Sequence, residues 1–125
     1  MGNINSAERV AREAEKYFWG GGAEQPMSIR ASILEGISKG VKYRFLFPKR
    51  FIPKELTIPG LAQAAEIRSM ENLPFNVAMN EKEAGISFQF VDGRVDYVSF
   101  VGKDSVFLNW VKELFLSYWE KGDRL

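Results

Sequence analysis

The chain has 125 residues, 46% of them apolar, and its 17 Lys and Arg against 16 Asp and Glu leave a formal net charge of +1. It contains no Cys and no His, which excludes disulfides, thiolate metal sites and the commonest acid-base group near neutral pH. This length predicts one domain over residues 1–125, and the nearly balanced charge argues against nucleic-acid binding across the whole surface.

The sequence also lacks the signals that direct a protein to a membrane. No apolar run approaches the roughly 20 residues of a membrane-spanning helix, and the first residues lack the apolar core of a signal peptide. We therefore expect a cytoplasmic protein with no membrane partner.

The N-terminal segment has a helical pattern. Small and apolar side chains recur at spacings of three and four between Ser6 and Phe18, and the glycine run 20–22 then interrupts the pattern. We expect residues 1–22 to form an N-terminal linker helix ahead of a core over residues 25–121.

A second helix and a strand follow. Apolar residues from Ile29 to Ile37 give a helical stripe, and Gly40 is suited to the left-handed conformation that ends many helices. Apolar and basic residues then alternate from Val41 to Phe47, which predicts a strand.

Residues 48–60 hold three prolines and four charges, which predict an extended surface loop. Its basic residues are Lys49, Arg50 and Lys54. A solvated loop is the ordinary explanation for them, and contact with an anionic ligand or a nucleic acid is the alternative.

Short elements lead to a hairpin. A helical turn over 61–65 and strands near 67–70 and 76–80 precede Asp92-Gly93, which is flanked by alternating apolar residues and suits a tight two-strand turn. The element order predicts an α/β or α+β fold, with a mixed sheet that ends in a C-terminal β-hairpin and is covered by helices.

The last of these helices is long and rich in aromatic residues. Asp104 or Ser105 can cap it, and it is expected to run to Lys121, with Gly122 as a left-handed stop. Its apolar residues cover an arc of about 220°, more than one sheet requires. Either it lies in the middle of a core, or one side packs on the sheet while the other meets a partner or a ligand. The candidates for a dimer or partner interface are Phe107, Val111, Phe115 and Trp119.

Two groups of motifs resemble a known family. The first comprises Gly40 to Leu46, Glu66 to Arg68 and Leu73 to Asn80, and it resembles the phospholipase D-like domain at the C-terminus of many archaeal transcription regulators. The second comprises Asp92 to Tyr97 with Asp104, Phe107, Trp110, Leu114-Phe115 and Tyr118-Trp119, and it resembles the methanogenesis-regulator type of effector domain. The resemblance covers roughly residues 25 to 121 and implies a regulatory domain that an N-terminal winged helix connects to DNA.

Two departures from this family bear on function. Phospholipase D enzymes use a His-x-Lys-x4-Asp motif, and the equivalent window here has Leu73, Phe75 and Asn80. Since the chain has no histidine, that chemistry is excluded. The residues before the resemblance are also too few for a winged helix, so we expect DNA contact only through an N-terminal domain absent from this chain.

Other chemistry finds little support in the residues. Carboxylates such as Asp92, Asp96, Asp104, Glu81 and Glu83 show no EF-hand or paired spacing, and turns and helix caps explain them better than a metal does. The serines lack a histidine base and a nucleophile elbow. We expect no enzyme, no catalytic or metal-binding residues and no cofactor.

Polar side chains within apolar strands, together with one tryptophan, are the candidates for a ligand site. They are Arg44, Arg68, Asn76, Tyr97 and Trp110. The two arginines can clamp a carboxylate or phosphate group, or they can simply pair with Glu66, Glu81 or Glu83.

The leading hypothesis is a ligand-sensing and dimerisation domain of a transcriptional regulator, forming a homodimer and binding a small anionic effector. The alternative is an interaction or scaffold module without a small-molecule ligand. A third possibility is direct nucleic-acid binding through the basic loop.

Overall fold

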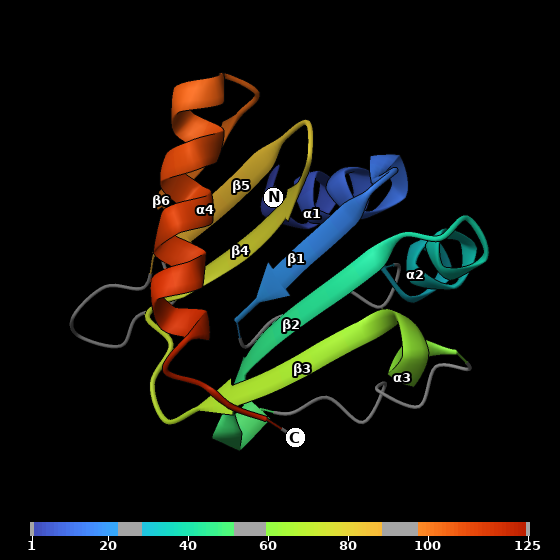
Figure 1. The fold of residues 1–125 in the computed structure, drawn as a ribbon. Coiled ribbons are helices and arrows are strands. Elements are labelled where there is room, and N and C mark those ends of the chain that lie inside the picture. Colours follow the sequence, from blue (N-terminus) through green and yellow to red (C-terminus); the bar gives the residue numbers. More distant parts are fainter. Residues whose placement is uncertain (1, 23–28, 52–59, 89–97, 125) are drawn as a thin grey trace.

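The computed structural model describes residues 2–22, 29–51, 60–88 and 98–124 (Figure 1). Its helices are α1 (Gly2–Glu13), α2 (Ile29–Ser38), α3 (Leu61–Ala64) and α4 (Ser105–Trp119), with a 3-10 turn η1 (Lys49–Phe51). Its strands are β1 (Tyr17–Gly21), β2 (Lys42–Pro48), β3 (Ala65–Met70), β4 (Phe75–Asn80), β5 (Ala84–Phe88), β6 (Val98–Gly102) and β7 (Asp123–Arg124). Within these ranges no helix is long and apolar enough to cross a membrane.

The strands form one mixed seven-stranded sheet in the order β6-β5-β4-β1-β2-β3-β7. β1, β2 and β3 run parallel, while β4, β5, β6 and β7 each run antiparallel to their neighbours. Helices α1 and α2 cover one face and α4 crosses the other (Figure 1). This confirms the expected mixed sheet covered by helices. β5 and β6 pair as expected for the hairpin, whereas Asp92-Gly93 lies outside the described residues.

Each face of the sheet buries its own apolar cluster. The cluster under α1 and α2 includes Val10, Phe18 and Phe45, and the cluster under α4 includes Trp19 and Phe115. Successive side chains of a strand point to opposite faces, so β1 contributes Phe18 to one cluster and Trp19 to the other.

The expected linker helix over residues 1–22 is wrong in its second half. α1 ends at Glu13, and residues 17–21 form the central strand of the sheet. The glycines expected to break a helix instead permit close packing. A Cβ atom at Gly20 would lie 3.0 Å from the Phe18 ring, and one at Gly21 would lie 3.1 Å from the carbonyl oxygen of Leu46. Both α1 and β1 therefore contribute residues to the core.

Local signals set the ends of the other helices. Gly40, at φ 86°, follows α2 in the left-handed conformation, as predicted. Asp104 caps α4, because its carboxylate accepts hydrogen bonds from the amides of Val106 and Phe107. The expected left-handed stop at Gly122 is wrong. Turn hydrogen bonds such as Gly122 N to the Trp119 carbonyl lead the chain from α4 into β7 instead.

α4 has one buried and one exposed side. Val111, Phe115 and Trp119 recur every four residues, are at most 3% exposed and pack on the sheet. On the other side Val106 is 75% exposed and Trp110 is 48% exposed. The assignment of the three buried residues to a partner interface is therefore wrong, because the domain's own sheet covers them.

Phe115→Ala should lower the free energy of unfolding by about 3–5 kcal/mol, because it removes a buried ring and leaves a cavity. Val106→Ala, on the exposed side of the same helix, should change it by less than about 0.5 kcal/mol. Urea unfolding followed by far-UV circular dichroism measures both. Equal losses for the two variants would contradict the observed orientation of α4.

Candidate functional site

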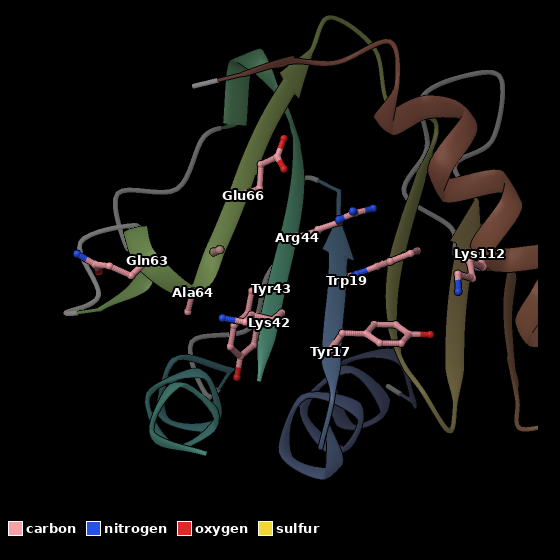
Figure 2. Close-up of a pocket in the computed structure, with 10 residues that line it drawn as sticks. Tyr17, Trp19, Lys42, Tyr43, Arg44, Gln63, Ala64, Glu66 and Lys112 are labelled. Atoms are coloured by element: carbon pink, nitrogen blue, oxygen red, sulfur yellow. The ribbon is translucent and has the colours of Figure 1, made fainter. Parts of the chain in front are cut away.

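The face of the sheet that carries α4 also holds an open pocket of about 380 Å³ (Figure 2). It lies where the three parallel strands begin, beside α3 and α4. Register explains this grouping, because Trp19 pairs with Arg44 and Arg44 pairs with Glu66, which sets these side chains next to one another on one face. The charged and aromatic residues that line the pocket include Tyr17, Trp19, Lys42, Arg44, Glu66 and Lys112.

The Arg44 guanidinium lies against two indole rings. Its central carbon is 4.9 Å from the ring centroid of Trp19 and 5.4 Å from that of Trp119. Both distances fall within the roughly 6 Å range of cation–π attraction. Among the described residues, no acceptor forms a hydrogen bond or ion pair with Arg44. Its N–H donors are therefore left for solvent or a ligand.

Glu66, the neighbour of Arg44 on β3, is engaged by two other arginines. Arg68 Nε donates to Glu66 Oε2 at 3.0 Å, and Arg124 Nε donates to the same oxygen at 3.2 Å. Burial tends to raise the pKa of Glu66, but the hydrogen bond from Arg68 and the charges of Arg124 and Arg68 outweigh it and keep that pKa below its ordinary value. Glu66 is thus an anion that already has its partners.

Arg68 also fastens the end of α4 to β3. Its Nη1 donates to the carbonyl oxygen of Trp119 at 2.8 Å, and its guanidinium carbon lies 4.5 Å from the centroid of the Trp119 ring. Arg44 and Arg68 therefore both contact Trp119. Arg68 pairs with Glu66, which is the ordinary role of an arginine in such a position, whereas Arg44 does not.

Lys112 and Tyr17 close the side of the pocket nearest α4 (Figure 2). The Lys112 ammonium nitrogen lies 5.8 Å from the ring centroid of Tyr17 and 5.5 Å from that of Trp19. Burial, aided by the charge of Glu81, raises the pKa of the Tyr17 hydroxyl, which therefore stays protonated at neutral pH and can donate a hydrogen bond.

The other sequence candidates do not join this group. Asn76 lies near the far end of β1, close to Gly22, and its Oδ1 is buried without a hydrogen-bond partner. Trp110 is on the exposed side of α4, where it stacks on Phe107 at 6.2 Å between ring centroids. Tyr97 lies outside the described residues.

Sequence reasoning missed Tyr17, Trp19 and Lys112 as site residues. The two aromatic residues were assigned to the end of a helix, although Tyr17 and Trp19 at alternate positions beside Phe18 also fit a strand buried on both faces. No pattern in the sequence marks Lys112 as a site residue, because only the packing of α4 brings it to the pocket.

The three positions that the sequence resemblance matches to the phospholipase D motif hold structural residues. Leu73 and Phe75 are buried in the cluster under α4, and the Phe75 ring meets the ring of Tyr118 edge-on at 4.9 Å. Asn80 is 1% exposed, and its amide donates to the carbonyl oxygen of Val10 at 2.8 Å. None of these side chains offers a nucleophile or an acid-base group.

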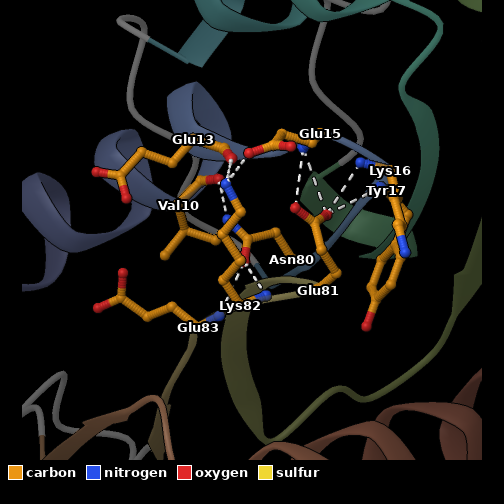
Figure 3. A network of polar contacts seen from close by, with 9 residues as sticks. All are labelled: Val10, Glu13, Glu15, Lys16, Tyr17, Asn80, Glu81, Lys82 and Glu83. Carbon is orange, nitrogen blue, oxygen red and sulfur yellow. Dashed lines mark hydrogen bonds and ion pairs between the residues drawn. The ribbon is translucent and has the colours of Figure 1, made fainter.

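Asn80 and Glu81 instead fix the turn between β4 and β5 (Figure 3). Asn80 Oδ1 accepts from the amides of Lys82 and Glu83 at 2.7 and 2.8 Å. The Glu81 carboxylate accepts from the amides of Glu15 and Lys16, each at 3.0 Å, and from that of Tyr17 at 3.3 Å. The turn is thereby tied to the start of β1, which is the pocket residue Tyr17.

The remaining charged candidates also have structural contacts. Glu83 forms an ion pair with Arg9, and Lys49 of the basic loop pairs with Asp123 at 3.0 Å. Arg50 has an interaction partner as well, and Lys54 is outside the described residues. In the ranges given above, no cluster of three or more acidic residues is placed to hold a metal ion.

Comparison with known proteins identifies the fold. No family model and no curated protein matches the sequence. TrmBL2, an archaeal chromatin protein with a novel mode of DNA binding, matches with a TM-score of 0.78 at 20% identity, over 98% of this chain and 51% of TrmBL2. Nuc, a phospholipase D family member from Salmonella typhimurium, matches with a TM-score of 0.69 at 11% identity, over 95% of this chain and 88% of Nuc. The fold is thus phospholipase D-like, and the chain spans about half the length of TrmBL2.

The Glu81 carboxylate should make stability depend on pH. Burial tends to raise its pKa, but the hydrogen bonds from the backbone amides dominate and lower it below the ordinary value of 4.5. A lowered pKa means that this stabilisation is present above pH 4.5 and is lost as the pH falls through the folded-state pKa.

Glu81→Gln should therefore lower the free energy of unfolding at pH 7 by about 1–3 kcal/mol and flatten its decline below pH 4.5. Urea unfolding at several pH values measures both effects. Glu113→Gln is the matched control, since Glu113 is exposed on α4. A wild-type pH profile in Glu81→Gln would contradict the role assigned to the carboxylate.

Proposed function

We propose that the chain is a non-catalytic regulatory domain of a transcription regulator, which senses a small anionic effector and forms a homodimer. The observation that carries this proposal is that Leu73, Phe75 and Asn80 occupy core and turn positions in a phospholipase D-like fold, at the window where such enzymes hold their catalytic motif. The likeness to TrmBL2, a protein described as binding DNA, supports the regulatory setting.

Sensing is assigned to the Arg44 pocket. A sensor needs a site with polar groups that do not already form hydrogen bonds within the protein. Arg44 meets this condition, whereas its neighbour Arg68 bonds to Glu66 and to the Trp119 carbonyl oxygen. A ligand there changes DNA binding only if its affinity differs between two arrangements of the protein. In this proposal the DNA is read by an N-terminal winged helix that is not among these 125 residues.

Dimerisation is assigned to the exposed side of α4 and to β6. Val106 and Trp110 on α4, and Phe100 and Val101 on β6, are 46–75% exposed. β6 is the last strand at its edge of the described sheet, and Val98–Gly102 contains no charged residue that would discourage pairing with another strand. The opposite edge is protected, because β7 consists only of Asp123 and Arg124. A second copy of the chain can pair along β6 and cover the apolar side chains of both copies.

A scaffold or docking module is the second candidate function. The same exposed residues favour it, because an apolar surface of this kind suits a different protein as well as a second copy. The two candidates differ in what they require of the isolated chain, since only the first requires self-association.

Sedimentation velocity over a range of concentrations should show a dimer that Trp110→Ala weakens about tenfold or more, as expected for loss of a central aromatic anchor. Leu34→Ala is the matched control, because Leu34 is 41% exposed on α2, on the other face of the sheet. A monomer at all concentrations would contradict the dimer and favour docking. Equal effects of the two substitutions would contradict the assigned surface.

A further inference from the structure

We propose that the Arg44 pocket binds a small organic anion with a carboxylate or phosphate head group and a flat apolar body. This inference rests on the sensing function proposed above and names the class of ligand for that site. It follows from the charge of the pocket, the state of Arg44 and the nature of the walls.

The charge around the pocket favours an anion. Lys42, Arg44 and Lys112 line it, against the single carboxylate of Glu66. That carboxylate is held by Arg68 and Arg124, which lie outside the lining. The local excess of positive charge is notable in a chain whose formal net charge is only +1. Among the residues that line the pocket, three cations thus face a single carboxylate.

The geometry of Arg44 favours a head group with two oxygens. Trp19 and Trp119 both lie within cation–π range of the guanidinium, and its N–H groups have no acceptor among the described residues. A guanidinium edge matches the paired oxygens of a carboxylate or phosphate in a bidentate contact. Arg44 is partly buried beside the two indoles, and this lower-dielectric setting strengthens such a contact. Lys112 adds a second charge from the side of the pocket formed by α4.

The walls favour an apolar body behind that head group. The Tyr17 ring and the methyl groups of Ala64 and Ala65 line the pocket together with the cations. A volume of about 380 Å³ exceeds what a bare phosphate ion fills, and it falls within the range of roughly 300–1,000 Å³ that is typical of small-molecule sites. An aryl group attached to the head group would cover these apolar walls.

Four small anions separate the contribution of the head group to binding from that of the apolar body. Acetate and methyl phosphate carry a small body, and benzoate and phenyl phosphate carry a flat one. Isothermal titration calorimetry on the intact chain should show that each aryl probe binds about tenfold or more tightly than the methyl probe with the same head group. The better of the two aryl probes then identifies the preferred head group.

Substitutions test whether binding occurs at Arg44. Arg44→Gln should weaken the better aryl probe about tenfold or more, and Arg44→Lys should recover only part of the loss, because a lysine lacks the guanidinium edge. Arg12→Gln is the matched control, since it makes the same change at an exposed position on α1, across the sheet. Lys112→Gln provides a second test on a side chain outside the sheet, and unfolding curves establish that each variant is folded.

The outcomes are distinct. Weaker binding in Arg44→Gln and Lys112→Gln with unchanged binding in Arg12→Gln would support the site. No binding of any probe to the wild-type chain, or equal binding in Arg44→Gln and Arg12→Gln, would overturn it. Sedimentation of the same samples reports the dimer independently, so failure of this ligand class is distinguishable from failure of the proposed regulatory assembly.

Discussion

The strand β1 imposes the constraint on which the rest of the domain depends, because it lies at the centre of a sheet whose two faces are both buried. Phe18 and Trp19, adjacent in sequence, enter opposite clusters and so hold both helical layers to one strand. The Trp19 ring stacks on Phe115 of α4, with ring centroids 5.3 Å apart, and its register with Arg44 places the guanidinium at the pocket. One side chain therefore fixes both the position of α4 and the geometry of the candidate site.

The sequence predicts those elements whose signals are local. Gly40 ends α2 and Asp104 begins α4 because each acts through its own backbone or through amides two and three residues away. β1 could not be predicted from local signals, because Tyr17 and Phe18 also continue the helical spacing of α1, and a glycine pair normally interrupts regular structure. Only tertiary packing, in which a Cβ at Gly21 would press on the backbone of β2, explains why glycines occupy a central strand.

The candidate site is predictable only where a single residue stands out. Arg44 and Arg68 are conspicuous because each is basic within an apolar strand, and both lie at Trp119. Their different roles depend on which of them Glu66 engages, and strand spacing alone does not determine that. A similar limit applies to α4. Its wide apolar arc predicts a surplus of apolar surface, but only the structure shows that Phe115 is covered while Trp110 is exposed.

Trp119 contacts the pocket residue Arg44 and ends α4, and the free energy of its contacts is comparable to the coupling free energy that regulation needs. Arg44 lies over its ring, and Arg68 contacts both its ring and its carbonyl oxygen. A cation–π contact contributes roughly 0.5–2 kcal/mol. Allosteric coupling free energies are about 1–3 kcal/mol, and a ligand supplies them only through different contacts in two states. An anion bound at the Arg44 guanidinium would change its contact with Trp119, an interaction of that size at the residue where α4 ends. Because α4 carries the exposed Trp110 on its other side, such a change would reach the outer surface through this helix.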